Sequence, residues 1–156
     1  MSQTRKAFYK GAARALPFFV VIVPFAMLFG VLSAEAGLGP WETQIFSIAV
    51  FAGASQLAAL QLMQDQAPVL VILATGLAVN LRMMMYSVAL TPHLGGAPLG
   101  IRATIAYFLV DQSFALSLAE FEKHRSLSVR EKVAFFFGTV APITACLLYT
   151  SPSPRD

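Results

Sequence analysis

Residues 67–90 read APVLVILATGLAVNLRMMMYSVAL, a run of 24 residues with one charged side chain, Arg82. A helix rises about 1.5 Å per residue, so about 20 apolar residues cross the hydrocarbon layer of a membrane, which is about 30 Å thick. The run exceeds that minimum, and its single charge lies well inside it. It therefore predicts a membrane-spanning helix.

Four further runs have the same character and extend the prediction to about five spanning helices. Each contains at most one charged residue, and they cover 15–34, 43–64, 103–119 and 133–149. Strands of a membrane β-barrel are shorter, about 10 residues, and alternate in polarity, which these runs do not. The expected fold class is an all-α, polytopic helical membrane protein in which some helices are broken.

The composition excludes several classes of protein. Hydrophobic residues make up 57% of the chain and charged residues 12%, about half of the roughly 25% charged residues usual in soluble domains. One cysteine, Cys146, excludes a disulfide framework, and His93 and His124 lie too far apart in sequence for a metal-binding motif. The sequence contains no phosphate-binding loop and no nucleophile motif. We therefore expect no metal, no cofactor and no enzymatic reaction.

The positions of the basic residues predict the orientation of the chain. Four Lys or Arg lie within 5–14 and four within the charged loop 120–132, which we expect to be solvated. Five spans would place both segments on one side of the membrane and leave only Arg102 on the other. Cytoplasmic segments are enriched in Lys and Arg. The chain is therefore predicted to be a multi-pass protein with its N-terminus in the cytoplasm, and the net charge of +3 does not indicate nucleic-acid binding.

Two ionisable residues lie inside the predicted spans, where a charge is costly and often functional. By helix rise, Arg82 and Asp111 lie at depths that differ by only a few ångströms in a layer about 30 Å thick, so a salt bridge between them is possible. In one interpretation Asp111 binds a proton or a substrate amine, and Arg82 tunes its pKa. In the other, Arg82 reaches the headgroups and Asp111 is a structural partner or a helix cap.

Neutral polar residues inside the spans add candidate binding groups. Ser55 and Gln56 lie in the second run, and Asn80 lies two residues before Arg82. Transporters bind ions and carboxylates at broken helices, whereas the structural alternative is packing and hydrogen bonding between helices. Residues that favour a break or hinge are Pro24, Gly30, Gly53 and Gly76.

Four short stretches contain most of these residues. They are Pro24-Phe25-Ala26 with Phe29-Gly30, Phe51-Ala52-Gly53-Ala54-Ser55-Gln56, Asn80-Leu81-Arg82 and Asp111-Gln112-Ser113-Phe114-Ala115. In this order they resemble the AzlC-type branched-chain amino-acid permease family, the large subunit of bacterial amino-acid exporters. Ala26 stands where the family commonly has glycine, and Gln112 where it commonly has an acidic residue. The resemblance covers about residues 5–142.

The resemblance implies gradient-driven export of small aliphatic amino acids across the inner membrane, together with a small AzlD-type membrane subunit. In this interpretation the substrate carboxylate contacts Gln56, Asn80 and Arg82, and its ammonium group contacts Asp111. The alternatives are a transporter or channel for another small solute, or a membrane scaffold that transports nothing.

The end of the chain departs from the pattern. From Cys146 the sequence reads CLLYTSPSPRD and loses its apolar character. We interpret residues 146–156 as a sequencing artefact. Residues 1–145 are then the N-terminal part of a single transmembrane domain, because members of the resembled family are longer.

Overall fold

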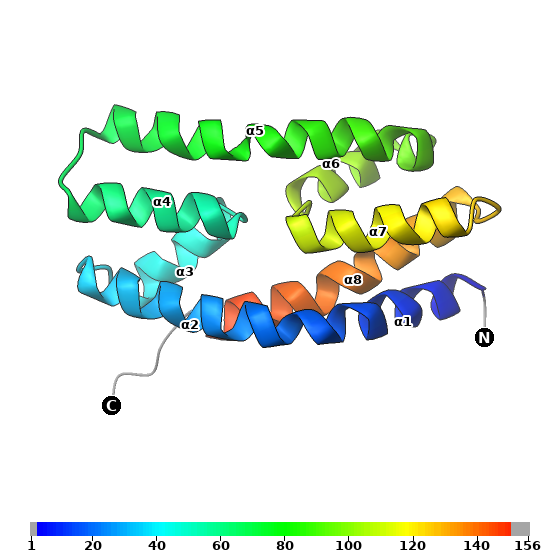
Figure 1. Cartoon of the computed structure of the whole chain (residues 1–156), viewed down its shortest axis with the longest axis horizontal. Helices are drawn as coiled ribbons and strands as arrows, with labels where there is room; N and C mark the ends of the chain where they lie inside the picture. The colour runs from blue at the N-terminus through cyan, green and yellow to red at the C-terminus, as the bar shows by residue number, and fades with distance from the viewer. Residues whose placement is uncertain (1–2, 151–156) are drawn as a thin grey trace. The chain divides into compact units, whose positions relative to one another are not determined.

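The structure, a computed structural model, describes residues 3–150 and the side chains of residues 3–148 (Figure 1). Within this range every regular element is a helix, which confirms the all-α fold class. The elements are α1 (Gln3–Ala15), the 3-10 turn η1 (Leu16–Phe18), α2 (Phe19–Glu35), α3 (Pro40–Ala49), α4 (Gly53–Gln64), α5 (Val69–Leu94), α6 (Leu99–Tyr107), α7 (Asp111–Lys123) and α8 (Val129–Thr150).

Among residues 3–148, three helical segments are long and apolar enough to cross a membrane: Gln3–Glu35, Val69–Leu94 and Val129–Leu148. The other two predicted spans fall on pairs of short helices. α3 and α4 have 10 and 12 residues, and α6 and α7 have 9 and 13. Helices of this size reach about 14–20 Å, less than the hydrocarbon thickness of about 30 Å. The expectation of broken helices is therefore confirmed, and the breaks divide these two spans.

The described chain forms two compact units. Unit 1 contains residues up to 19 together with 83–144, and unit 2 contains 20–82 together with residues from 145 onward. The long helix α5 contributes its first half to unit 2 and its second half to unit 1. The single transport domain over 1–145 stays a prediction. The predicted artefact begins within α8, and its last residues, 151–156, lie outside the described residues.

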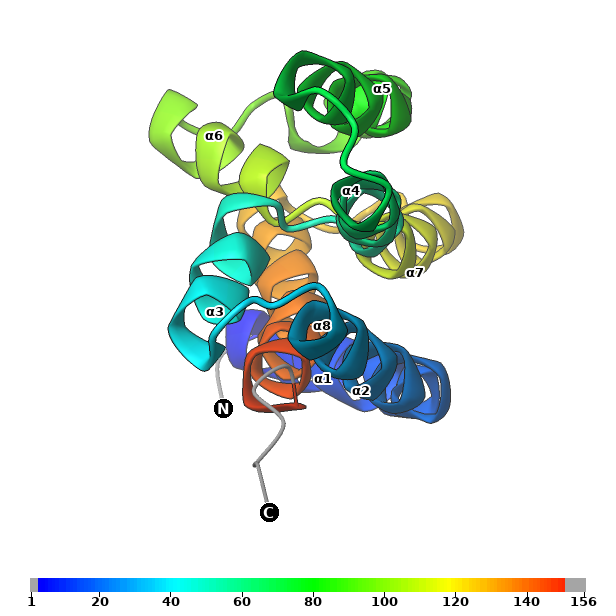
Figure 2. The same cartoon turned by 90° about the vertical axis from the view of Figure 1, so that its left-hand side faces the viewer.

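In unit 2, α3 and α4 form a hairpin that enters and leaves at the same end. The side-chain amide of Gln64, the last residue of α4, donates to the carbonyl oxygen of Leu32 near the end of α2, at 3.4 Å. α4 therefore returns to the place from which α3 starts (Figure 1). α3 runs obliquely to α4 (Figure 2) and packs on α2 through Phe46 and Phe29, whose ring centroids are 5.8 Å apart.

In unit 1, α6 and α7 form a hairpin of the same kind. The ring of His93, in the last turn of α5, lies 5.6 Å from the ring of Phe121 near the end of α7. α7 therefore returns to the end of α5 from which α6 starts. The apolar core beneath this hairpin consists of Leu90, Leu94, Ile105, Leu109, Phe121, Phe135, Phe136 and Val140.

The two hairpins repeat one pattern at an offset of 58 residues. Pairs at this offset are Pro40 and Pro98, Gly53 and Asp111, and Ser55 and Ser113. The hydroxyl of Ser33 donates to the carbonyl of Phe29 at 2.7 Å, and at the same offset Thr91 donates to Ser87 at 2.8 Å. Each repeat is one long helix followed by one hairpin.

Within unit 1, α1 crosses α8 at two glycines. A Cβ atom on Gly11 would overlap the carbonyl oxygen of Phe135, and a Cβ atom on Gly138 would overlap the carbonyl oxygen of Phe8. Small residues at such crossings let two membrane helices approach backbone to backbone. The crossing fixes α1 against the unit 1 core.

Candidate transport site

The unit 2 hairpin is broken at residues 50–52. The amino end of α4 therefore lies inside the protein. Ala52 is extended (φ −152°, ψ 104°) and its side chain provides no cap. The amide of Gln56 makes a hydrogen bond to the Ala52 carbonyl at 3.0 Å, so the amides of Gly53, Ala54 and Ser55 have no acceptor within the helix. A helix amino end carries a partial positive charge of about 0.5 and favours a carboxylate.

Gln56 adds a buried amide to this helix end. Its side chain is 0% exposed, and its Nε2 donates to the carbonyl oxygen of Val50 at 2.6 Å. Its Oε1 has no hydrogen-bond partner within the described part of the chain. A buried acceptor without a partner is costly, and an ammonium group is a donor that would satisfy it.

α5 contributes to the same place through Asn80. The Ser55 hydroxyl, 1% exposed, donates to the carbonyl oxygen of Gly76 at 3.2 Å and accepts from Asn80 Nδ2 at 3.5 Å. Asn80 Oδ1, like Gln56 Oε1, lacks a partner among the described residues. The predicted residues Ser55, Gln56 and Asn80 therefore lie together in unit 2.

α2 closes the site through Phe25. A Cβ atom on Gly53 would lie 2.6 Å from Cε1 of the Phe25 ring. The ring therefore packs directly on the first helical residue of α4, at a distance that only glycine allows. Three of the four stretches quoted from the sequence meet at this point, one each from α2, α4 and α5.

The remaining predicted residues have a different placement. Arg82 is the last residue of unit 2 on α5, and Asp111 is the first residue of α7 in unit 1. Their salt bridge stays a prediction. Of the four predicted breaks, Gly53 lies at a break, whereas helical structure continues through Pro24, Gly30 and Gly76. Membrane helices tolerate proline and glycine because neighbouring groups satisfy the backbone. The role of these three residues as hinges stays a prediction.

Two buried residues of α7 were not identified from the sequence. Ser113, 0% exposed, accepts from the Val110 amide at 3.0 Å and shapes the second break; its pairing with Ser55 at the offset of 58 residues was the available signal. The sequence predicts that Glu120 lies in a solvated loop, but α7 extends to Lys123 and Glu120 is 2% exposed. The expectation was wrong here because Glu120 has cationic partners on α1, far away in the sequence.

The chain is similar to known membrane proteins. The model of the family described as AzlC protein matches residues 17–151, which reaches into the segment 146–156. An uncharacterized membrane protein of Archaeoglobus fulgidus is 32% identical over 120 residues, 77% of this chain and 52% of that protein. Inner membrane protein YgaZ of Escherichia coli K12 is 25% identical over 114 residues, 72% of this chain and 46% of that protein. The chain thus spans about half the length of these curated relatives. No solved structure matches it significantly.

Proposed function

The chain belongs to the AzlC family, and we propose that it takes part in gradient-driven export of small aliphatic amino acids, together with a small AzlD-type membrane subunit. The observation that carries the proposal is the broken helix α3–α4, at which polar groups of α4 and α5 gather inside an apolar protein. Discontinuous helices of this kind hold zwitterions and ions in many transporters. The proposal involves no chemical conversion of the substrate.

The groups at the break match the two charges of an amino acid. The amides of the first turn of α4, which have no acceptor within the helix, suit the carboxylate. Gln56 Oε1 and Asn80 Oδ1 have no partner among the described residues and suit the ammonium group, which is a strong donor. Phe25 offers apolar contact for an aliphatic side chain. A contact of the carboxylate with Arg82 stays a prediction, because residues two apart on a helix do not face the same side.

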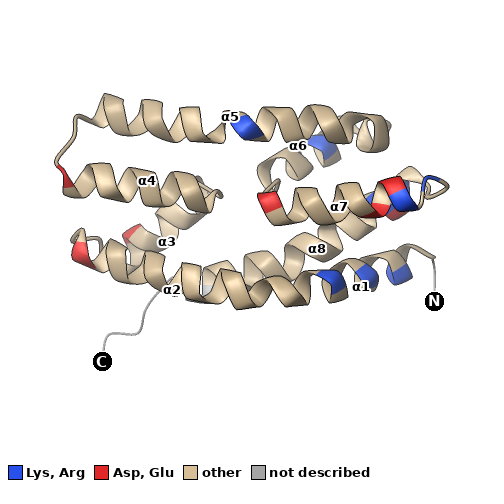
Figure 3. Cartoon of the chain, viewed as in Figure 1, with Lys and Arg blue, Asp and Glu red and all other residues tan. Residues whose placement is uncertain are grey.

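Charge distribution supports an orientation with the N-terminus in the cytoplasm. The segment 36–68, between the first and second long helices, contains no Lys or Arg, whereas Lys and Arg occur in 5–14, in 95–128 and in the first turn of α8 (Figure 3). With three spans these basic segments lie on one side, where cytoplasmic segments are expected. Arg102, expected alone on the opposite side, joins them because α6 and α7 re-enter instead of crossing.

Gln56→Ala is expected to slow valine export about tenfold or more, because a buried hydrogen bond to a charged group contributes about 1.5–3 kcal/mol. Efflux is measured from cells loaded with a valine dipeptide that express the chain alone or with an AzlD-type subunit. Gln61→Ala, on the same helix but exposed, is the matched control and should export normally. Equal rates for the two variants at equal expression would refute the site.

Asp111→Asn is expected to remove the dependence of export on pH, because an amide does not bind and release a proton between acidic and neutral pH. Asp111→Glu keeps a carboxyl group and should keep the dependence. Initial efflux rates are compared between an acidic and a neutral external medium. An unchanged pH profile in Asp111→Asn contradicts a proton-carrying role for this residue.

A further inference from the structure

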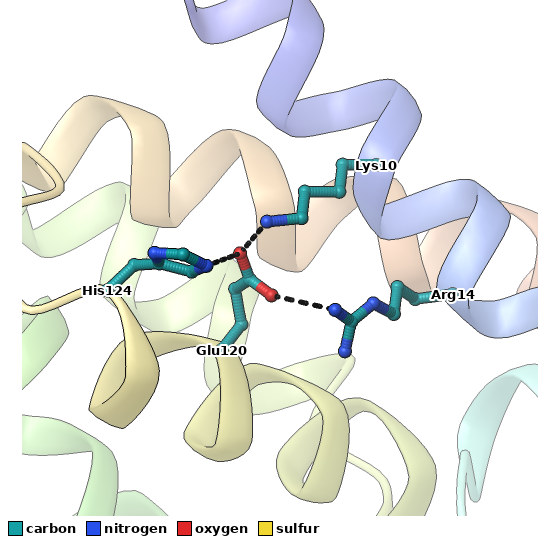
Figure 4. A network of polar contacts seen from close by, with 4 residues as sticks. All are labelled: Lys10, Arg14, Glu120 and His124. Carbon is teal, nitrogen blue, oxygen red and sulfur yellow. Dashed lines mark hydrogen bonds and ion pairs between the residues drawn. The ribbon is translucent and has the colours of Figure 1, made fainter.

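Glu120 stands at the centre of a charged cluster in unit 1 (Figure 4). Lys10 Nζ donates to its Oε1. Arg14 Nη2 lies 3.7 Å from its Oε2, and His124 Nε2 lies 3.6 Å from its Oε1. The Glu120 side chain is 2% exposed, whereas the side chains of Lys10, Arg14 and His124 are 43%, 45% and 42% exposed.

The cluster connects two helices that are distant in the sequence. Lys10 and Arg14 belong to α1, which the glycine crossing fixes against α8, and Glu120 belongs to the last turns of α7. A buried carboxylate is stable only while its cationic partners remain. The contact therefore ties the end of α7, at which the hairpin returns to α5, to α1. Because the partners are half exposed, solvent is available to them when the contact opens.

The face of α7 that carries Glu120 is polar along its length. Ser117 and Ser113, one and two turns earlier on the same face, are both 0% exposed. The Ser117 hydroxyl has no hydrogen-bond partner within the described part of the chain. Small hydroxyls form no interlocking apolar contact, so the Glu120 cluster is the main polar contact of this face, whereas the neighbouring Phe121 packs in the unit 1 core against Phe135.

The hairpin of unit 2 has no ion pair at the position that corresponds to Glu120. At the offset of 58 residues the position of Glu120 corresponds to Leu62, which cannot form an ion pair. Two hairpins of the same construction are therefore held by different forces. Alternating access requires this kind of inequality, because only one side of the site opens at a time.

We propose that the α6–α7 hairpin is a gate on the side of the membrane that carries α1, and that Glu120 holds it closed. Glu120 is a positioning residue: it acts through Lys10 and Arg14 and does not contact the substrate. Opening exchanges the ion pairs for water and exposes the break at residues 108–110. The consequence for transport rests on the proposed function, whereas the movement itself is measurable without it.

The test uses thiol labelling of the full chain in membranes opened to both sides. In a Cys146→Ser background, Ser113→Cys and Ser55→Cys place one thiol at the corresponding position of each hairpin; both serines are at most 1% exposed. Adding Glu120→Gln should raise the labelling rate at position 113 at least fivefold and leave that at position 55 unchanged. Lys10→Gln with Arg14→Gln should have the same effect if Glu120→Gln does not accumulate.

Charge reversal distinguishes opening of the hairpin at Glu120 from a general loss of packing in the protein. Glu120→Lys combined with Lys10→Glu and Arg14→Glu restores attraction and should return the labelling rate at position 113 toward its original value. A labelling rate at position 113 that never changes, or a parallel rise at position 55, overturns the proposal. Valine efflux is measured separately in intact cells that express the Glu120 variants with Ser55 and Ser113 unchanged, so that a failure of transport alone counts against the proposed function and not against the gate.

Discussion

Gly138→Ala should lower the free energy of unfolding by about 2–3 kcal/mol, because the added methyl group overlaps backbone and not a flexible side chain. Its Cβ would meet the carbonyl oxygen of Phe8 on α1, and the backbone carbon of that residue lies only 2.9 Å away. α1 must therefore move off α8. Without a steric conflict, alanine in a helix is favoured over glycine by about 1 kcal/mol. A decrease in the free energy of unfolding would therefore indicate that α1 crosses α8 at this glycine, and an increase would indicate that it does not.

The stability change is measured by thermal or SDS-induced unfolding of the purified chain in detergent. At about 2–4 °C per kcal/mol, the expected drop in Tm is about 4–12 °C. Gly100→Ala is the matched control, because it is also a helical glycine but has nothing within 4 Å of the added Cβ. It should leave Tm unchanged or raise it. If Gly138→Ala behaves like Gly100→Ala, α1 does not cross α8 at this glycine.

Gly53→Ala should reduce export about tenfold or more while changing stability less than Gly138→Ala does. The new Cβ would lie 2.6 and 2.7 Å from two ring atoms of Phe25. A ring can rotate or shift where a backbone carbonyl cannot, so the strain is relieved locally. The relief displaces either the ring or the amino end of α4, and a displacement of about 1 Å at a binding site is enough for a large loss of rate.

The double variant Gly53→Ala with Phe25→Ala distinguishes steric conflict from loss of flexibility. Removing the ring gives the methyl group space, so part of the export should return relative to Gly53→Ala alone. Efflux and expression are measured for both single variants and the double variant, which together give the coupling between the two positions. Additive losses with no recovery would contradict the packing of Phe25 on Gly53.

The sequence was sufficient to predict the helical class and residues that lie together at the candidate site, but not the positions of the hairpin breaks. The long helices appear as apolar runs, and Gly53, Ser55, Gln56 and Asn80 stand out because they are polar or small within them. The break itself reads Val50-Phe51-Ala52 and contains no turn residue. A break inside a membrane protein is satisfied by protein groups such as the Gln56 side chain and not by water. The side chains of the break can therefore stay apolar, so the hydropathy of the sequence does not reveal where the break lies.

The same reasoning explains why Glu120 was assigned to a solvated loop. Its neighbours in sequence are charged, and a charged segment at the end of a helix is ordinarily exposed. The burial of Glu120 depends on Lys10, which is 110 residues away. A partner at such a distance leaves no local pattern. The 58-residue offset between the hairpins was, by contrast, available in the sequence, because Pro40 and Pro98 precede equally spaced serines.

Under the proposed function, hairpins that re-enter the membrane would also have an electrical consequence. Arms of 10 and 12 residues turn back after about 15–18 Å, roughly halfway through a layer about 30 Å thick. Water that reached the break of one hairpin would bring the electrical potential of the solution on that side of the membrane to the middle of the bilayer. The transmembrane voltage then falls across the remaining half, and a unit charge that moves only that far exchanges about 2.3 kcal/mol at 100 mV. Under the proposed function, short movements near the break would thus be sufficient for an ion gradient to drive transport.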